Sequence, residues 1–488
     1  MTTLVWIQRE FRVDHAPVIQ AALESSDKVI LAYFHDESQV IGEANSAWLA
    51  QSLLSFKETL KIHSADLWMI EGDFQESLFR LITEQNIQQV YYSYQVGSPF
   101  AQMQQTALEV CKGQKVALTP FYTEFLLEPD SMLNKQNRAY LVYTPFYKNF
   151  LSKQFQIEAL DDVKQYQQQL KLAGLVTLPK AYANLPSTLQ NILAQPWAKK
   201  ILAHWQVGEK AAWQTLQKFI EEEMVDYSSD RDFPAIMATS TLSSYLHYGE
   251  ISIRAIYFYV QTRVEQGELK ADIAQPWLRQ LVWKEFARHL LHWFPETEAE
   301  PFQKKYLEVK WPYDAYFVNR WQTGQTGIPI IDAGMRELWE TGIMHNRVRM
   351  LVASFLTKNL NQHWLLGKKW FDNTLLDADP ANNVMGWQWV AGCGVDAAPY
   401  YRLFNPVTQS QKFDKEGEYI KRWLPELKTL SNKAIHEPWA HKMECEMKRI
   451  VLGEHYPKPL VDLKQSREAH LARVNEMKVN RPQMPNNA

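Results

Sequence analysis

The sequence predicts an α/β domain with a doubly wound parallel sheet, followed by a larger all-α domain. Short apolar runs alternate with helical segments in the first quarter of the chain, and apolar residues recur at helical spacing almost throughout after Trp205. The chain has 488 residues, which is more than one average domain contains. We place the α/β domain at 1–125 and the helical domain at 206–475, with a connector at 126–205 and a tail at 476–488.

Strands of the α/β domain are expected where the apolar runs are short, at 3–8, 28–35, 65–71 and 90–94. Helical segments at 16–25, 46–63 and 76–87 separate them. Strand, helix and strand at this spacing predict parallel pairing, with helices on both faces of the sheet. No glycine-rich phosphate fingerprint follows the first strand, so the domain carries no sequence signal for a dinucleotide at that turn.

The connector is predicted from weak periodicity and from the prolines that interrupt it, which are Pro129, Pro145, Pro179, Pro186 and Pro196. Helices are predicted from about residue 206 to residue 475. A closing helix is expected near the end, without a long extension of disordered composition.

Composition restricts the class of protein. Hydrophobic residues make up 46% of the chain and charged residues 22%, and no apolar run approaches ~20 residues, so we expect a soluble cytoplasmic protein without membrane contact. Three cysteines are too few for a disulfide framework or a metal cluster, and no metal site is predicted. The net charge of −3 means that any nucleic-acid contact needs a local basic face. The 18 tryptophans are the unusual feature, since most follow Trp205.

The stretch from Gly327 to Phe413 holds the densest chemistry. Two amphipathic helices are expected there, with apolar faces formed by Ile331, Met335, Leu338 and Trp339, and by Met344, Val348, Leu351, Val352 and Phe355. On the second helix, Asn346, Arg349 and Met350 stand at i, i+3 and i+4 and share a face. An amide, a cation and a thioether on one face are unusual for a core.

Two carboxylates, Asp377 and Asp379, follow these helices. They could form a buried ion pair with an arginine, which more often marks a site than a stability device. They could also cap the next helix and complement its dipole. Both explanations remain open on spacing alone.

Two further segments combine structural and functional signals. Thr239 and Ser240 precede an apolar pattern and predict a helix start capped by hydroxyls, whose free N–H groups suit an anion, although an ordinary capped helix is the alternative. On the helix around residue 280, Trp277, Gln280, Trp283 and Lys284 form one stripe. Core packing commonly explains such a stripe, but next to nucleic acid it would stack bases and neutralise phosphate.

Six colinear segments carry a family likeness: MHNRVRM, DADPANN, GWQW, DAAPY, RLFNP and KFDKEGEYIKRWLPEL. In order and spacing the chain resembles the photolyase and cryptochrome flavoproteins, most closely the class I enzymes that repair cyclobutane pyrimidine dimers in DNA. The resemblance implies non-covalent FAD in the helical domain and damaged DNA as the substrate of a light-driven carbon–carbon lyase. A monomer is expected.

The resemblance also implies roles for individual residues. Cofactor contacts are expected from Tyr227, Thr239, Ser240, Thr241, Leu242, Ser243, Trp277, Arg349, Asp377, Ala378, Asp379 and Asn383. Within this set Arg349 would pair with the two aspartates, and Asn383 would face the central flavin ring. Trp387, Trp364 and Trp311 match the family's chain of three tryptophans, which carries an electron from the surface to the flavin.

The substrate side is implied in the same way, from Arg231, Gln280, Trp283, Lys284, Asn346, Arg347, Met350, Trp389 and Gln409, with Arg402 and Lys412 on a basic rim. Enzymes for the (6-4) photoproduct have His where Asn346 and Met350 stand, because that chemistry needs proton transfer. Dimer splitting is therefore the better fit. Trp283 and Trp389 would flank the flipped-out dimer.

The sequence departs from the family at several positions. Gln280 stands where dimer-repair enzymes have Glu, Lys284 where they have Arg, and Thr241 where Arg is common. In the α/β domain the family can hold an antenna chromophore, a folate or a deazaflavin, but the stretch 94–99 lacks the carboxylate that contacts folate. A cryptochrome-like photoreceptor that signals to a protein partner is the alternative function. A non-catalytic structural or RNA-binding protein of this fold is a third hypothesis.

Overall fold

The computed structural model describes residues 1–157, 176, 178–397, 399 and 402–479. Most of the predicted tail, part of the connector, and Ala398 and Tyr400 of the DAAPY segment lie outside the described residues. The chain divides into two compact units. Unit 1 comprises 1–228, 238–298 and 372–382, and unit 2 comprises 229–237, 299–371 and 383–488. The domain boundaries predicted above remain a proposal.

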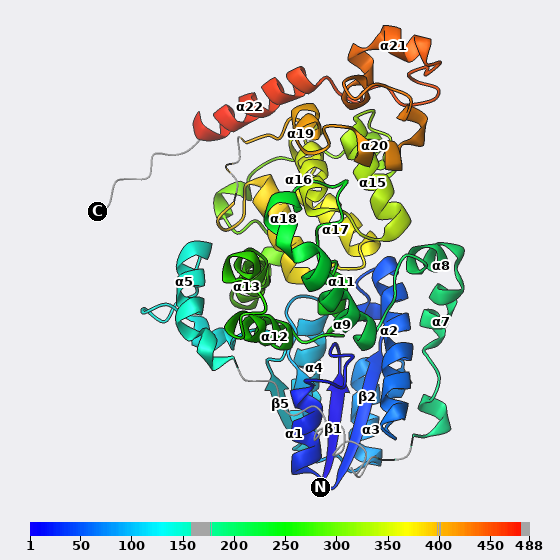
Figure 1. The fold of residues 1–488 in the computed structure, drawn as a ribbon. Coiled ribbons are helices and arrows are strands. Elements are labelled where there is room, and N and C mark those ends of the chain that lie inside the picture. Colours follow the sequence, from blue (N-terminus) through cyan, green and yellow to red (C-terminus); the bar gives the residue numbers. More distant parts are fainter. Residues whose placement is uncertain (158–175, 177, 398, 400–401, 480–488) are drawn as a thin grey trace. The chain divides into compact units, whose positions relative to one another are not determined.

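Unit 1 contains a five-stranded parallel sheet, formed by β1 (Thr2–Ile7), β2 (Lys28–His35), β3 (Trp68–Glu71), β4 (Gln89–Ser93) and β5 (Ala117–Phe121). The strand order is β3-β2-β1-β4-β5, so the order reverses between β1 and β4 (Figure 1). The predicted parallel sheet is confirmed. The fifth strand was not predicted, because ALTPF is largely exposed and carries no strong apolar pattern.

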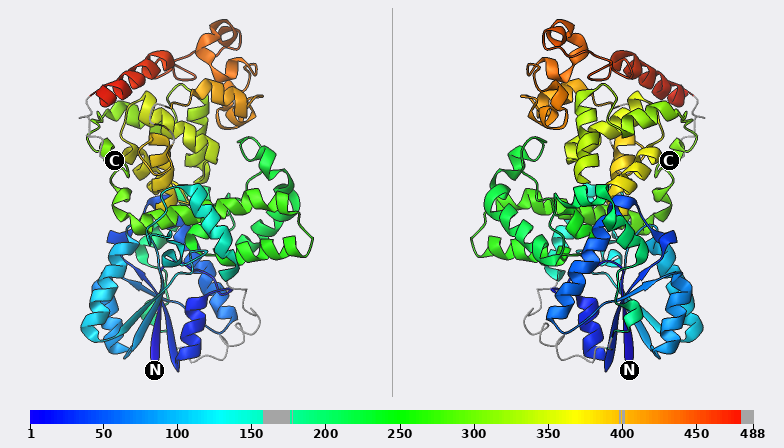
Figure 2. Two further views of the ribbon diagram at one scale, coloured as in Figure 1. Left: turned by 90° about the vertical axis from the view of Figure 1, so that its left-hand side faces the viewer. Right: turned by 90° about the vertical axis from the view of Figure 1, so that its right-hand side faces the viewer.

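Helices cover both faces of the sheet (Figures 1 and 2). Side chains of α3 (Phe74–Glu84) and α4 (Phe100–Gln114) form a core with alternate residues of β1, β2 and β3 on one face. The other face carries α1 (Pro17–Ser25) and α2 (Glu43–Ile62), where Phe56 of α2 meets Phe11 and, through it, Tyr33. Burial of alternate strand residues on opposite faces explains the apolar runs seen in the sequence.

The rest of unit 1 is helical: α5 (Tyr143–Lys153), α7 (Ser187–Ala194), α8 (Pro196–Leu202), α9 (Glu209–Lys218), α10 (Tyr227–Asp230), α11 (Ser243–Tyr248), α12 (Ile253–Glu265) and α13 (Ala271–Trp293). Buried carboxylates join these helices to the loops of the sheet. Glu209 accepts from the Val13 and Asp14 N–H groups, and Glu285 of α13 accepts from the N–H groups of residues 126 and 127. These bonds satisfy loop amides that burial would otherwise leave unpaired.

Unit 2 is helical in its described residues, with α14 (Ala315–Gln322), α15 (Pro329–Thr341), α16 (Asn346–Ser354), a π-helical turn η9 (Phe355–Asn359), α19 (Pro406–Phe413), α20 (Glu418–Trp423), α21 (Lys442–Met447) and α22 (Leu463–Val479). The helices α17 (Trp364–Thr374) and α18 (Pro380–Ala391) each contribute residues to both units. Within the described residues, no helix has the length and apolar character needed to span a membrane.

The two helices predicted after Gly327 are α15 and α16, and Asn346, Arg349 and Met350 do lie on one helix. One predicted apolar position is wrong. Trp339 is 57% exposed and stacks on Trp370 at 6.0 Å, whereas Leu338 beside it is buried, so Trp339 lies outside the buried face of α15.

Candidate functional site

Helix α13 carries the stripe predicted from the sequence. Trp277 is buried, whereas Gln280 and Trp283 are half-buried, and Gln280 Nε2 donates to the Pro276 carbonyl at 3.2 Å. One face of the Trp283 ring is covered by Tyr143 of α5, with the ring centroids 3.4 Å apart and the planes at 5°. Phe286 also contacts the Trp283 ring, at a centroid distance of 6.0 Å with the planes at 72°.

Lys284, Arg288 and Asp379 form a buried charge cluster in unit 1. Asp379 Oδ2 lies 3.1 Å from Lys284 Nζ and 2.8 Å from Arg288 Nη2, and Asp379 Oδ1 accepts from the Asn382 N–H at 3.0 Å. Burial alone would raise the pKa of Asp379, but the two cations outweigh burial and hold it far below its usual range. The two explanations of this carboxylate both apply, since Asp379 caps α18 and forms buried ion pairs.

This cluster assigns Lys284 to a different partner from the one predicted. The sequence placed Lys284 against DNA phosphate, whereas its side chain is only 11% exposed and is bonded to Asp379. Burial lowers the pKa of Lys284, and the positive charge of Arg288 lowers it as well, against the attraction of Asp379. Arg288 was missed. It stands one helical turn after Lys284, so i, i+4 spacing could have indicated it.

The predicted hydroxyl cap is wrong. The helix α11 begins at Ser243, its N-cap is Leu242, and no side chain caps it. Thr241 has φ +50° and is half-buried, as are Thr239 and Ser240, so the chain reaches α11 through a tight turn that moves the hydroxyls out of capping geometry.

Unit 1 nevertheless contains buried polar atoms without a protein partner. Ser244 Oγ is fully buried and unpaired, and so are Nε and Nη1 of Arg288. An orphaned buried donor is costly unless a ligand satisfies it. With two cations against Asp379, this cluster favours an anionic ligand, and a flavin dinucleotide supplies phosphate, ribose and ring oxygens of that kind. Ser244 was also missed by the sequence analysis.

The remaining predicted cofactor residues of unit 1 are buried, except Ser243, which is exposed. The rings of Tyr227 and Trp277 both contact Phe219, at centroid distances of 5.8 and 5.4 Å, so the two side chains belong to one aromatic cluster. Asp377 and Ala378 are buried just before Asp379.

In unit 2, α16 presents the predicted polar face. Asn346 is exposed at its first turn, and Arg349 and Met350 are half-buried. The Arg349 Nε donates to the Met344 carbonyl at 2.7 Å, which fixes the guanidinium beside the start of the helix. The predicted pairing of Arg349 with the two aspartates stays a prediction, since the ion pairs described for Asp379 are those with Lys284 and Arg288.

The predicted basic rim is partly assembled within unit 2. Arg347 pairs with Asp232 at 2.7 Å and lies over the Phe413 ring at 4.3 Å, and Lys412 Nζ contacts the same ring at 4.9 Å. Arg402 is exposed and lies over Phe404. Gln409 and Trp389 are half-buried, and Arg231 is half-buried next to Asp232. Cations held over aromatic rings keep their charge while covering apolar surface.

The predicted electron-chain tryptophans lie in unit 2. Trp387 is buried, and its ring contacts Phe371 at 5.0 Å and Trp321 at 6.1 Å. Gly367 makes room for it, because a Cβ at that position would overlap the Trp387 ring. Asn383, one turn earlier on α18, is buried and donates from Nδ2 to the Lys368 carbonyl at 3.2 Å.

The other two tryptophans differ in burial. Trp364 is 1% exposed at the start of α17, whereas Trp311 is half-buried. Both contact the ring of His363, at 5.8 and 5.3 Å. His363 had no place in the sequence analysis.

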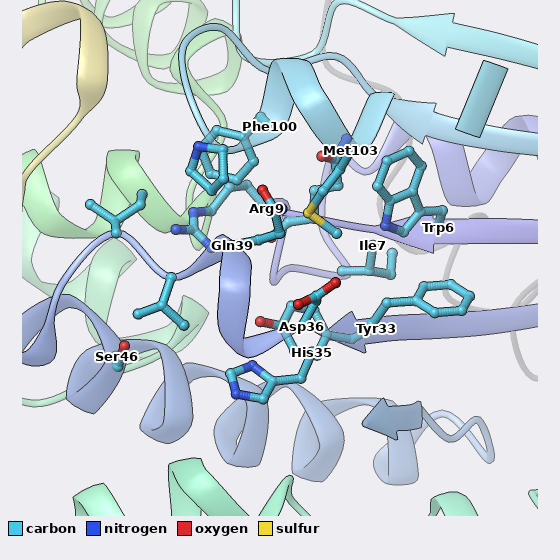
Figure 3. Close-up of a pocket in the computed structure, with 15 residues that line it drawn as sticks. Trp6, Ile7, Arg9, Tyr33, His35, Asp36, Gln39, Ser46, Phe100 and Met103 are labelled. Carbon is cyan, nitrogen blue, oxygen red and sulfur yellow. Dashed lines mark hydrogen bonds between the residues drawn. The ribbon is translucent and has the colours of Figure 1, made fainter. Parts of the chain in front are cut away.

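A pocket also opens at the carboxyl ends of β1 and β2 and beside the start of α4, next to the point between β1 and β4 where the strand order reverses (Figure 3). Trp6, Arg9, Asp36, Phe100 and Met103 are among its lining residues. The Arg9 guanidinium is buried between the rings of Phe100 and Tyr248, at 5.0 and 4.8 Å, and its Nε has no partner. In open α/β sheets this reversal point is where ligands commonly bind.

Comparison with known proteins places these features in a family. Residues 3–165 match the family model described as DNA photolyase, and residues 277–476 match the model described as FAD binding domain of DNA photolyase. The chain is 35% identical to a deoxyribodipyrimidine photo-lyase of Agrobacterium fabrum and 34% identical to one of Alkalihalophilus pseudofirmus, with 96% of each chain covered.

The chain belongs to the photolyase and cryptochrome family. It therefore carries the FAD-binding domain of that family, as predicted, and the orphaned donors of unit 1 fit the cofactor. Cryptochrome-2 of Arabidopsis thaliana is 30% identical over 96% of this chain and 77% of its own length.

Solved structures agree with this assignment. A class III photolyase from Agrobacterium tumefaciens is 34% identical, with a TM-score of 0.88 and 98% of both chains covered. An archaeal photolyase from Sulfolobus tokodaii, described with two FAD molecules, is 25% identical, with a TM-score of 0.80 and 98% of this chain and 100% of that chain covered.

Proposed function

We propose that this protein uses light to repair cyclobutane pyrimidine dimers in DNA, as a deoxyribodipyrimidine photolyase. The observation that carries the proposal is the match along 96% of the chain to relatives named deoxyribodipyrimidine photo-lyase, at a higher identity than to a named cryptochrome. Asn346 and Met350 support dimers as the lesion, because neither side chain can transfer a proton as His does.

Reduced FAD supplies the chemistry when bound, since light allows it to lend an electron that opens the cyclobutane ring and then returns. The residues of the protein would bind and orient the cofactor and the lesion. Ser244 and the free donors of Arg288 would hold oxygens of the cofactor, and the ion pair with Asp379 fixes the position of Arg288. Cofactor contacts of Asn383 and Arg349 stay predictions from the family resemblance.

The lesion would be held by aromatic and polar side chains. Trp283, which stacks on Tyr143, would flank a flipped-out base, and Gln280 on the same helix can pair with a pyrimidine edge through its amide. Arg402 and Lys412 would neutralise phosphates on the surface of unit 2, whereas Arg347 is already paired with Asp232. Lys284 is committed to Asp379 and so contributes no phosphate contact in this proposal.

The test is direct. The reduced holoprotein is irradiated with an oligonucleotide that contains one thymine dimer, and recovery of thymine absorbance is followed. Light-dependent recovery is expected. If dimers persist although FAD is bound and reduced, the photoreceptor alternative replaces repair, and protein partners captured only in the light would then be sought.

We also propose that the pocket at the strand reversal holds a planar antenna chromophore of the flavin or deazaflavin class. The unpaired Arg9 Nε and the ring of Phe100 would contact a flat, oxygen-bearing heterocycle. The Sulfolobus tokodaii relative, whose structure is described with two FAD molecules and a light-harvesting role, supports this. The stretch 94–99 lacks a carboxylate, which disfavours folate.

Binding of an added flavin beyond one per chain tests this second site. We expect a second equivalent bound by the natural protein and only one by Ile41→Trp, because Ile41 lines the pocket and an indole there would fill it. A stoichiometry of one for both proteins would exclude a flavin antenna.

A further inference from the structure

His363 contacts two of the tryptophans predicted to form the electron chain. Its ring centroid is 5.3 Å from that of Trp311, with the planes at 64°, and 5.8 Å from that of Trp364, with the planes at 29°. Among the described residues, His363 is the aromatic ring that both tryptophans contact. Trp364 is fully buried and Trp311 is half-buried, so His363 stands where the chain of rings passes from interior to surface.

The backbone fixes the state of this imidazole. His363 directly precedes α17, and its Nδ1 accepts the Leu365 N–H at 3.1 Å, as an N-cap side chain does. Because the Nδ1 lone pair is engaged, the proton of the neutral ring is on Nε2. Burial lowers the pKa of His363, which favours the neutral ring over the cation.

We propose that His363 is a positioning residue that couples Trp311 to Trp364 during electron transfer. This inference rests on the proposed electron chain. Trp387 would give one electron to bound FAD when light excites the flavin. Trp364 would then give one electron to Trp387, Trp311 would give one to Trp364, and a thiol reductant in solvent would give one to Trp311. His363 gains and loses neither electron nor proton. A neutral imidazole is harder to oxidise than an indole, so it can fill the space between the two without trapping the charge.

A capping role alone does not account for the geometry. Asn, Asp and Ser are the preferred caps, and none of them would place a flat ring against two indoles. A neutral ring is also required, because an imidazolium would repel the positive charge that forms on either tryptophan.

Two substitutions separate the roles. His363→Asn keeps an oxygen that can cap α17 but removes the ring, whereas His363→Phe keeps a neutral ring but removes the cap. If coupling is the function, transient absorption of the holoprotein should show transfer from Trp311 slowed about tenfold in His363→Asn and nearly unchanged in His363→Phe. The opposite order, with only His363→Phe impaired, would reduce His363 to a helix cap and overturn the inference.

Further variants test the charge and the chain. His363→Lys places a cation at the position and should slow the same transfer by about tenfold or more. His292 provides a control, since its ring meets Trp293, outside the chain, at 4.9 Å, and His292→Ala should leave the transfer unchanged. Trp311→Phe should abolish the long-lived oxidised tryptophan. If the long-lived oxidised tryptophan persists in Trp311→Phe, the proposed electron chain is wrong. If it is lost in Trp311→Phe but His363→Asn transfers electrons at the wild-type rate, only the role of His363 is wrong.

A measurement in the dark checks the premise without photochemistry. ¹⁵N NMR of the imidazole nitrogens should show His363 as the neutral Nε2–H form near pH 7. An imidazolium signal there would contradict the role of a neutral bridge.

Discussion

Asp379→Asn should destabilise the protein and weaken FAD binding. The substitution preserves the shape of the side chain, and the amide oxygen can still accept the Asn382 N–H that caps α18. What disappears is the negative charge between Lys284 and Arg288, whose side chains are 11% and 2% exposed. The change therefore leaves two buried cations without a counter-ion.

Breaking a buried ion pair on one side costs about 3–5 kcal/mol. Lys284 can limit this cost by releasing its proton, since burial already lowers its pKa, so the lower end applies. A loss of about 3 kcal/mol shifts the folding equilibrium more than a hundredfold. Urea unfolding followed by tryptophan fluorescence measures it, and gel filtration followed by the visible spectrum measures retained FAD.

Glu268→Gln is the matched control, because Glu268 forms an exposed pair with Arg263 in the same unit and should change stability by less than about 1 kcal/mol. The double variant Asp379→Asn with Lys284→Met should recover part of the loss, since one orphaned cation is removed. The wild-type protein should also lose stability as the pH falls below about 4, where the unfolded aspartate gains a proton, and Asp379→Asn should lack that contribution. If Asp379→Asn matched Glu268→Gln in stability and kept its FAD, the charge cluster would have no structural role.

Four further outcomes are expected. Trp387→Phe should keep the fold and lose flavin photoreduction, because a phenyl ring is harder to oxidise; a wild-type rate would move the chain elsewhere. Gly367→Ala should also slow photoreduction, because the added methyl overlaps Trp387, and an unchanged rate would show that the indole can shift freely. Gln280→Glu should repair dimers as fast or faster, since a charged hydrogen bond is worth about 1.5–3 kcal/mol, and slower repair in the thymine assay would contradict this. Glu250 accepts hydrogen bonds from Trp48 and Ser52, and burial raises its pKa to about 8. Its contribution to the free energy of unfolding therefore falls as pH rises from 4.5 to 8. In Glu250→Gln the free energy of unfolding should depend less on pH over that range, and an unchanged pH dependence would contradict this.

The sequence alone determined what depends on neighbours along the chain. Short apolar runs placed four of the five strands, and apolar residues at helical spacing placed the helices α15 and α16. The shared face of Asn346, Arg349 and Met350 also followed from helical spacing. The six segments from MHNRVRM to KFDKEGEYIKRWLPEL indicated the photolyase and cryptochrome family because they are long and colinear. These signals are local, so they survive without knowledge of the packing.

Tertiary structure alone decided the partners. Asp379 meets Lys284 and Arg288 from about ninety residues away, and no local pattern could choose them over Arg349. The hydroxyl cap at Thr239 failed because the Thr241 turn redirects the backbone. His363 became visible only when folding brought Trp311 against it. Charge pairing and ring contact depend on distances of a few ångströms, and these are set by how helices pack, which the periodicity of one helix does not encode.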